Sequence, residues 1–378
     1  MLRTIQNFTM VPLILAAFLI FGAVSAQAAC APGTQQVIIF HAGSLNNAFK
    51  AIEAKFTADT GICVTDQAFG SLDMVRQATA GGLPADIIAP ADYLDIDLFL
   101  KEAGYADYNI LFAEGKMVLA YLESDVVTSK GYTIDDGTLF NPPGSVPNAV
   151  ADWYNILLKS NVTIGGSHLY LDPSGYRAPM IFRLAQKFYE QPNLYNDLLE
   201  HYVATPAAGA PAGTFALGKN FNFQLIYVRN AQATALGDAT ATPPVVANPD
   251  YRYVNLPDDI NLGNDAKNHY YKHAVIVVPD LFGTGFVPLP ASRVIWGVTV
   301  LRNAPNKDNA VLFLQYLLGT EGQADLTTHG PDPISPAVVS HRDYKKLPQA
   351  LQSLVQIDDS HEIDLDRCRK EDDRDGWR

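Results

Sequence analysis

Basic residues are scarce in this sequence. Its 378 residues include 27 Lys and Arg against 40 Asp and Glu, so the formal net charge is −13, and the basic residues form no cluster. A nucleic-acid groove or a site for an anionic membrane surface needs such a cluster, so neither partner is expected. An anionic ligand would have to be held by local dipoles rather than by a basic patch.

A membrane-spanning apolar run is also missing. The apolar run Met10–Val24 is shorter than the roughly 20 residues that a bilayer-spanning helix needs. Because Arg3 precedes this run and Ala26-Gln27-Ala28 follows it, residues 1–28 are predicted to be a removed export signal and the mature protein to be periplasmic. Lipid anchoring at Cys30 is the alternative, although Gln27 stands where a lipoprotein signal has an aliphatic residue.

Cysteine is rare, and its spacing matches no metal cage or thiol nucleophile. The three cysteines are Cys30, Cys63 and Cys368. In an oxidising compartment three cysteines suggest one disulfide and one free thiol. Cys30 precedes the first expected strand and Cys63 begins the second, which favours a structural Cys30–Cys63 disulfide.

Short β-branched runs alternate with helical patterns, which predicts an α/β fold with parallel sheets. The expected early elements are strands at 37–40, 64–69 and 85–89 and helices at 44–56 and 72–79. Further strands at 117–122 and 294–301 are separated by about 170 residues with elements of their own. A second lobe inserted into the first, with crossing strands as a hinge, is therefore expected.

The expected domain boundaries follow from this insertion. They are residues 29–121 for the first part of lobe 1, 122–275 for the inserted lobe 2, 276–355 for the return to lobe 1, and 356–378 for a charged C-terminal tail, of which 361–378 is expected to be solvated. The Ala- and Gly-rich stretch 206–218 is expected to be a surface insertion in lobe 2.

Three turns are candidates for ligand binding, because open α/β sheets bind ligands beyond the carboxyl ends of their strands. They are Gly43-Ser44, Gly70-Ser71 and Asp172-Pro173, each at the expected start of a helix. Helix starts present N–H groups and a positive dipole end to a ligand. Each turn could also be an ordinary helix cap. Together they indicate an oxyanion site without a basic side chain.

Longer motifs occur around these turns, and with them the chain resembles the molybdate/tungstate-binding proteins of ABC importers, in particular the branch that also serves as tungstate receptor. The resemblance covers about residues 36–340. Its segments are FHAGSL at 40–45, GSLDMVR at 70–76, PADIIAPADY at 84–93, YADYNILFAEGKMVLAY at 105–121, DPSGYR at 172–177, LPDDINL at 256–262 and RVIWGVTVLRNAPN at 293–306.

The resemblance implies a type II periplasmic-binding-protein fold of two lobes that close on one oxyanion. It implies that Ser44 and Ser71 donate hydrogen bonds to that oxyanion, beside Gly43 and Gly70. It also implies that Asp172 is the first of two carboxylates that can bind the Mo or W atom directly. The ligand would be molybdate or tungstate, with no cofactor, and the partner an ABC permease at the inner membrane that receives it from a monomer.

The second carboxylate of that branch is missing here. Tyr227 stands in its place, and no glutamate occurs between Glu200 and Glu321. In the other branch of the family a tyrosine near this place donates its hydroxyl to a tetrahedral anion. Asp172 would repel an anion in a closed cleft unless it is protonated, bound to the metal, or turned away as a helix cap. A mainly hydrogen-bonded, tetrahedral and fully deprotonated anion is favoured, which selects molybdate, tungstate or sulfate over phosphate.

Other residues leave alternatives open. Arg177 and Arg229 could contact the ligand, but both are expected to lie behind the site or on the surface. His41 beside Ser44 would suit a secreted hydrolase, for which the sequence places no orienting third group. Tyr176 and Tyr227 would suit a receptor for ferric ion.

Two further expectations concern the cleft and the function. Asp92 and Tyr93 follow an expected strand and either shape the cleft wall or pack at the strand end. The expected function is a non-enzymatic receptor for molybdate or tungstate, with a receptor for another anion such as sulfate as the alternative.

Overall fold

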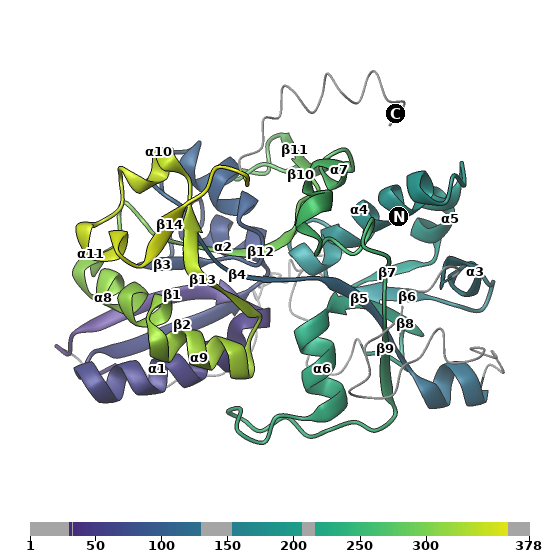
Figure 1. Cartoon of the computed structure of the whole chain (residues 1–378), viewed down its shortest axis with the longest axis horizontal. Coiled ribbons are helices and arrows are strands. Elements are labelled where there is room, and N and C mark those ends of the chain that lie inside the picture. Colours follow the sequence, from purple (N-terminus) through teal and green to yellow (C-terminus); the bar gives the residue numbers. More distant parts are fainter. Residues whose placement is uncertain (1–29, 32, 130–152, 206–215, 362–378) are drawn as a thin grey trace, which may run out of the picture.

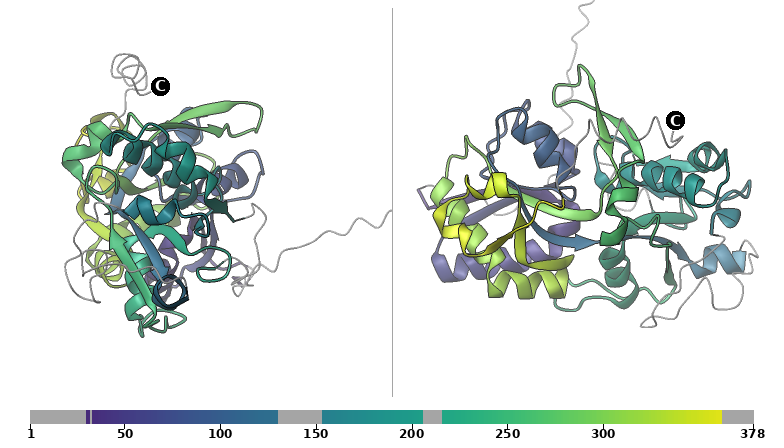
Figure 2. Two further views of the ribbon diagram at one scale, coloured as in Figure 1. Left: turned by 90° about the vertical axis from the view of Figure 1, so that its right-hand side faces the viewer. Right: turned by 45° about the horizontal axis from the view of Figure 1, so that its top comes forward.

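The computed structural model describes residues 30–31, 33–129, 153–205 and 216–361. Figure 1 shows two α/β lobes side by side, and the right-hand view of Figure 2 shows the same division. The expected export signal, Cys368, nearly all of the 206–218 insertion and the tail beyond residue 361 lie outside the described residues. Among the helices of the described ranges, none combines the length and the apolar character needed to cross a bilayer.

Lobe 1 is built on a seven-stranded sheet with the strand order β14-β13-β4-β12-β3-β1-β2. All seven residues of β12 are buried, as expected for a central strand with both faces covered. The strands are β1 (Gln36–Ala42), β2 (Cys63–Phe69), β3 (Ile87–Ala89), β4 (Ile110–Gly115), β12 (Val294–Val300), β13 (Asp332–Val339) and β14 (Val355–Ile357). The helices are η1 (Gly43–Leu45), α1 (Asn46–Thr60), α2 (Ser71–Ala78), η2 (Ile96–Lys101), α8 (Lys307–Leu318), α9 (Thr320–His329), α10 (His341–Tyr344) and α11 (Gln349–Gln352).

Lobe 2 is built on a five-stranded sheet with the order β7-β6-β8-β5-β9. The strands are β5 (Met117–Leu122), β6 (Ile164–Gly166), β7 (Tyr202–Ala204), β8 (Phe223–Tyr227) and β9 (Tyr251–Asn255). The helices are η3 (Ser124–Ser129), α3 (Trp153–Leu157), α4 (Pro173–Phe188), α5 (Leu194–Glu200) and α6 (Val228–Leu236). Helix α4 lies near β8 and carries the residues that reach back toward lobe 1.

Both sheets are mixed, so the expectation of parallel sheets is wrong in this respect. In lobe 1, β1 runs parallel to β2 and β3, but β12 runs antiparallel to both β3 and β4. In lobe 2, β5 runs antiparallel to β8 and β9. Strands β4 and β12, which carry the chain out of lobe 1 and back into it, form one of these antiparallel pairs.

The chain enters lobe 2 earlier than the boundary after Tyr121 that the sequence suggests. Strand β4 pairs in the seven-stranded sheet, whereas β5, from Met117, already pairs with β8 and β9. Only Lys116 separates the two strands, so the crossing takes a single residue. Asn261 and Leu262 lie alongside it, since their carbonyls accept hydrogen bonds from Met117 N (2.8 Å) and Val294 N (2.7 Å).

The return to lobe 1 also differs from the expected boundary at residue 276. The chain rejoins the seven-stranded sheet only at Val294, the start of β12. Before that it forms η5 (Asp265–Lys267), α7 (Asn268–Tyr271) and a separate two-stranded hairpin of β10 (Val275–Pro279) and β11 (Phe286–Pro290). This hairpin projects from the molecule in both views of Figure 2, and β10 lies near α4 of lobe 2.

The first residues of the expected C-terminal tail, 356–378, are part of lobe 1. Strand β14 reaches Ile357 and pairs with β13. His361 is buried, and its carbonyl accepts a hydrogen bond from the Tyr93 hydroxyl at 3.0 Å. The expected start of the tail at residue 356 is therefore wrong, because this short edge strand and the Tyr93 contact fix the chain as far as residue 361.

The expected disulfide between Cys30 and Cys63 is confirmed. It fastens the chain ahead of β1 to the first residue of β2, the edge strand of lobe 1. Lipid anchoring at Cys30 requires the same sulfur atom, so the disulfide and a thioether-linked lipid exclude each other.

Replacing Cys63 by serine should lower the free energy of unfolding by about 3–4 kcal/mol, the loop-closure contribution expected for a sequence separation of 33 residues. Urea unfolding of the purified mature protein measures this change, and Cys30→Ser should give the same loss. Equal stability of variant and wild type would contradict the structural role.

Because the disulfide occupies the Cys30 sulfur, the intact mass of the wild-type protein should show no acyl group.

Candidate functional site

A cavity of about 210 Å³ lies between the lobes, below the roughly 300–1,000 Å³ of pockets that bind drug-sized molecules. Lobe 1 and lobe 2 both contribute to its wall. The lining residues are Ala42, Gly43, Ser44, Ser71, Ala91, Ser167, Asp172, Pro173, Ser174, Gln224, Ile226, Tyr227 and Asn230. Five of the six site residues predicted from the sequence are among them, namely Gly43, Ser44, Ser71, Asp172 and Tyr227, whereas Gly70 does not line the cavity. None of the lining residues in the described part of the chain is Lys, Arg or His.

The first turn brings Ser44 into the cavity directly after β1. Ser44 lies within the short helix η1 and does not cap α1, contrary to its alternative reading as a cap. Instead its Oγ accepts a hydrogen bond from Trp296 Nε1 at 2.9 Å. Since an indole N–H can only donate, the Ser44 hydroxyl hydrogen remains available to a ligand.

The second turn places Ser71 in the same way. Ser71 is fully buried and begins α2, where Gly70 is the cap residue and forms no side-chain cap hydrogen bond. The backbone N–H of Ala91 donates to Ser71 Oγ at 2.9 Å. The Ser71 hydroxyl is thus also oriented as a donor.

Two backbone N–H groups at the start of α2 do not face the cavity, contrary to the expectation for a helix start. The N–H groups of Leu72 and Asp73 donate to the carbonyl of Leu171 in lobe 2, at 3.1 and 3.4 Å. These two groups at the helix start therefore hold the lobes together rather than facing the cavity.

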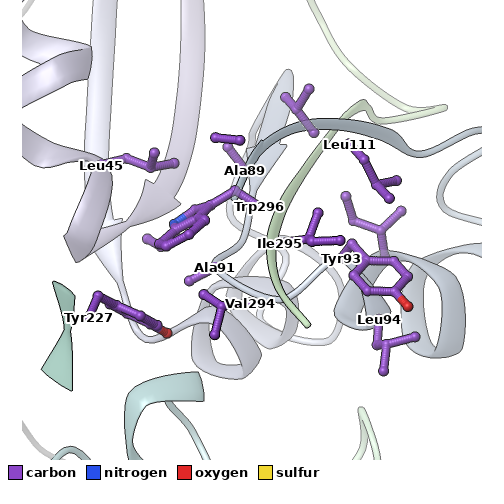
Figure 3. Close-up of a cluster of buried hydrophobic side chains, with 14 of the residues drawn as sticks. Leu45, Ala89, Ala91, Tyr93, Leu94, Leu111, Tyr227, Val294, Ile295 and Trp296 are labelled. Atoms are coloured by element: carbon purple, nitrogen blue, oxygen red, sulfur yellow. The ribbon is translucent and has the colours of Figure 1, made fainter. Parts of the chain in front are cut away.

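Tyr227 is the third hydroxyl group of the wall. It ends β8, and its Oη accepts a hydrogen bond from Arg177 Nη1 at 2.7 Å. Its ring lies beside that of Trp296, with 5.0 Å between the ring centroids (Figure 3). Burial raises the pKa of the Tyr227 phenol, so the hydroxyl keeps its hydrogen at neutral pH.

Asp172 caps α4 and also reaches the cavity. Its Oδ1 accepts a hydrogen bond from Ser174 N at 2.8 Å, and Pro173 occupies the first helical position, as the sequence suggests. Its Oδ2 lies toward Gly70, 3.3 Å from the place where a Cβ at Gly70 would stand. Burial raises the pKa of Asp172, and the hydrogen bonds from Ser174 only partly offset this effect. A protonated Asp172 would not repel an anion.

The other candidate residues lie outside the cavity. His41 is fully buried, with Nε2 3.0 Å from Asp66 Oδ2 and Nδ1 2.9 Å from the Ala42 carbonyl, and so forms no dyad with Ser44. Arg177 lies behind Tyr227. Arg229 of α6 donates to the Gly330 carbonyl of lobe 1 at 3.1 Å. Both arginines are placed as expected from the sequence.

Asp92 and Tyr93 also lie outside the cavity wall. The Tyr93 hydroxyl bonds to the His361 carbonyl, and Asp92 accepts hydrogen bonds from the Leu94 N–H and the Tyr176 hydroxyl. Both side chains are buried, which supports the alternative of packing after the strand end.

Sequence reasoning missed part of the wall. Ser167, Gln224, Ile226 and Asn230 line the cavity without having been candidates. Gln224, Ile226 and Asn230 lie within seven residues of chain that include Tyr227, so the strand-to-helix turn at β8 was the available signal.

Further contacts between the lobes surround the cavity. His329 Nδ1 at the end of α9 lies 2.7 Å from Asp238 Oδ2 of lobe 2. Burial alone would raise the pKa of Asp238, but hydrogen bonds from His329 and Thr240 outweigh it and lower that pKa. Toward the hairpin, Arg76 of α2 donates to the carbonyls of Pro279 and Asp280. The lobes therefore touch on more than one side of the cavity.

A small polar cavity between two α/β lobes defines the class of two-lobed solute receptors. The sulfate-binding protein SubI from Mycobacterium tuberculosis shares this fold, with a TM-score of 0.53 and 15% identity over 80% of this chain and 88% of that chain. The chain belongs to the family described as bacterial extracellular solute-binding proteins, whose model matches residues 37–331.

Individual relatives match over most of their length. The molybdate/tungstate-binding protein WtpA of Pyrococcus abyssi is 30% identical over 86% of this chain and 91% of its own. An uncharacterised solute-binding protein of Methanoculleus marisnigri is 31% identical over 85% of this chain and 87% of its own. The similarity therefore extends over both lobes.

Replacing Gly70 by alanine should hinder contact between the lobes. The added Cβ would stand 2.7 Å from the Leu171 carbonyl oxygen of lobe 2, closer than real Cβ contacts come. We expect at least a tenfold loss of ligand affinity, measured by calorimetry, with little change in the thermal stability of the ligand-free protein.

Gly43→Ala is the matched control. A Cβ at Gly43 would meet nothing within 4 Å, although Gly43, unlike Gly70, lines the cavity. Its affinity should stay within about twofold of wild type. Equal behaviour of the two variants would show that lobe contact at Gly70 is not needed for binding.

Proposed function

We propose that this protein is the substrate-binding protein of an ABC importer and that it captures molybdate or tungstate in the cavity between its lobes. The observation that carries the proposal is the set of three hydroxyl groups, on Ser44, Ser71 and Tyr227, that each accept an N–H hydrogen bond and so face the cavity as donors. An oxyanion without hydrogen atoms offers only acceptors and matches such a set.

The same argument disfavours phosphate. At neutral pH phosphate carries at least one hydrogen, which would meet hydroxyl groups that already accept from N–H donors. Sulfate fits the donor set as well as molybdate does, so a sulfate receptor is the second candidate. The relatives named as molybdate/tungstate-binding proteins, about 30% identical over both lobes, favour the larger anions.

We propose a tetrahedral, hydrogen-bonded anion rather than a six-coordinate metal. Asp172 is the one carboxylate among the lining residues in the described part of the chain, and its Oδ1 is engaged by the Ser174 N–H. Direct coordination of Mo or W by Asp172 is the alternative that the experiment below separates.

The site offers little for catalysis, and we propose that the protein is not an enzyme. Ser44 accepts from Trp296, and both ring nitrogens of His41 face other partners, so His41 is not a base for this serine. A ferric-ion receptor would need clustered tyrosines, but Tyr176 is fully buried with its hydroxyl on Asp92 and does not line the cavity.

The transport role follows from lobe contact. Binding would shift the population toward the form in which the lobes touch, and a permease that contacts both lobes would recognise that form. We propose that the mature protein works as a monomer in the periplasm, needs no cofactor, and delivers its anion to the permease of the inner membrane.

Calorimetric titration of the mature protein with molybdate, tungstate, sulfate and phosphate tests the proposal. We expect one-to-one binding of molybdate and tungstate and much weaker binding of phosphate. Asp172→Asn keeps a capping oxygen and removes the charge, so its affinity should equal or exceed that of wild type. Because Asp172 has a raised pKa, wild-type affinity should fall as pH rises through that pKa, and this dependence should be weaker in Asp172→Asn.

Two further variants complete this test. Asp172→Ala should lose about 1 kcal/mol of stability with the cap but keep its affinity. Ser44→Ala combined with Ser71→Ala should lose binding. A loss of more than 100-fold in Asp172→Asn would establish the carboxylate as a metal ligand. Failure of wild type to bind any of the molybdate, tungstate and sulfate anions would refute the proposed function.

A further inference from the structure

Arg177 is a buried cation that contacts both lobes. It lies on α4 of lobe 2 with 1% of its surface exposed. Its Nη1 donates to Tyr227 Oη at 2.7 Å, and its Nη2 donates to the Ala91 carbonyl of lobe 1 at 2.9 Å. Nη2 also lies 3.4 Å from Asp92 Oδ2. One side chain thus touches a residue of the cavity wall in each lobe.

The guanidinium group decides the direction of the Tyr227 hydrogen bond. Arginine has only donors, so the Tyr227 oxygen must accept and its hydrogen must be directed elsewhere. Tyr227 lines the cavity, and the pKa raised by burial keeps that hydrogen in place. In this arrangement Tyr227 can donate to a ligand oxygen but has little capacity to accept from a ligand hydrogen.

The same side chain supports the residue that orients Ser71. The Ala91 carbonyl accepts from Arg177, and the Ala91 N–H donates to Ser71 Oγ. Ala91 is therefore held on both sides, and its position depends on contact between the lobes. Three hydrogen bonds thus link the Tyr227 hydroxyl of lobe 2 to the Ser71 hydroxyl of lobe 1 by way of Arg177 and Ala91.

A neighbouring carboxylate stabilises the buried cation of Arg177. Asp92 is its ion-pair partner, and the Tyr176 hydroxyl donates to Asp92 Oδ2 at 2.9 Å. Burial and the neighbouring Asp92 raise the pKa of Asp95 well above its usual range, which favours its neutral form. Burial also raises the pKa of Asp92, but Arg177 and the hydrogen bonds from Leu94 and Tyr176 favour the charged form of this ion-pair partner.

We propose that Arg177 is the positioning residue that makes the cavity selective for fully deprotonated oxyanions. It does so by fixing the Tyr227 hydroxyl as a donor and tying it to the Ala91 and Ser71 side of lobe 1. This inference rests on the proposed function, since it names the residue behind the selectivity of that same site. It extends that function from the residues lining the cavity to one that does not touch the ligand.

A double-mutant cycle between Arg177 and Tyr227 tests the inference. The variants are Arg177→Met, Tyr227→Phe and the pair, each titrated by calorimetry with molybdate and with inorganic phosphate at pH 8. Arg177→Met should weaken molybdate binding at least tenfold without weakening phosphate binding, so the ratio of the two affinities falls. In the Tyr227→Phe background the same change should cost less than threefold, because the hydroxyl that Arg177 orients is absent.

Three controls separate orientation from general damage to the fold. Arg177→Lys keeps a group that only donates and should recover part of the lost selectivity. Arg183→Met removes a cation from the same helix, where it stacks over Tyr195, and should leave both affinities unchanged. If Arg177→Met fails to fold because Asp92 is left unpaired, the pair Arg177→Met with Asp92→Asn replaces it in the cycle.

The outcomes distinguish this inference from the proposed function. If wild type binds molybdate and the effects of the two substitutions simply multiply, Arg177 does not act through Tyr227 and the inference is wrong. An unchanged ratio of molybdate to phosphate affinity in Arg177→Met would overturn it equally. If wild type binds no oxyanion at all, the proposed function fails first and the inference fails with it.

Discussion

The hydrogen bonds that Ser44, Ser71 and Tyr227 accept from N–H groups are the constraint on which the site depends. A hydroxyl group can donate or accept, and an unconstrained one adapts to either kind of ligand atom. Here an indole, a backbone amide and a guanidinium group each donate to one of these oxygens, so that each hydroxyl hydrogen is directed elsewhere. The donors for a ligand are thus set by groups that do not line the cavity, apart from Ala91.

Those three N–H donors come from distant parts of the chain, so the fold has to bring them together. Trp296 belongs to β12, the strand by which the chain re-enters lobe 1, and Arg177 belongs to the inserted lobe 2. The one-residue crossing at Lys116 and the return at Val294 lie side by side through Asn261 and Leu262. Trp296 thus reaches Ser44 because the chain returns from lobe 2 at β12, whereas Arg177 and Tyr227 meet within lobe 2.

The sequence predicted the elements that local patterns determine. The strands β1 and β2, the Gly-Ser turns after them and the Asp172 cap follow from apolar runs and helix-start residues read over short windows. The crossing was misplaced because residues 110–122 form nearly one apolar segment, interrupted by Glu114, Gly115 and Lys116, and pairing partners alone decide where one sheet ends.

The role of Arg177 was out of reach for a different reason. Nothing adjacent to it in the sequence indicates Tyr227 or Ala91 as a partner, since these contacts span 50 and 86 residues. A lone arginine near a capping aspartate is an ordinary surface pattern, and only the packing of α4 against both lobes turns it into a buried donor. Tyr227 itself was placed by resemblance to a family, and its hydroxyl direction follows from that packing.

The pairing of Tyr227 with Arg177 bears on how a chain of net charge −13 could hold a dianion beside Asp172. A second carboxylate at position 227 would add a negative charge to the wall, and two carboxylates facing an oxyanion need a metal centre to offset their repulsion. A tyrosine hydroxyl in that place removes the charge and supplies a hydrogen-bond donor, while the cation behind it stays buried. With one carboxylate left, whose pKa is raised by burial, the site as we propose it holds the anion by hydrogen bonds, without coordination of the metal by the protein.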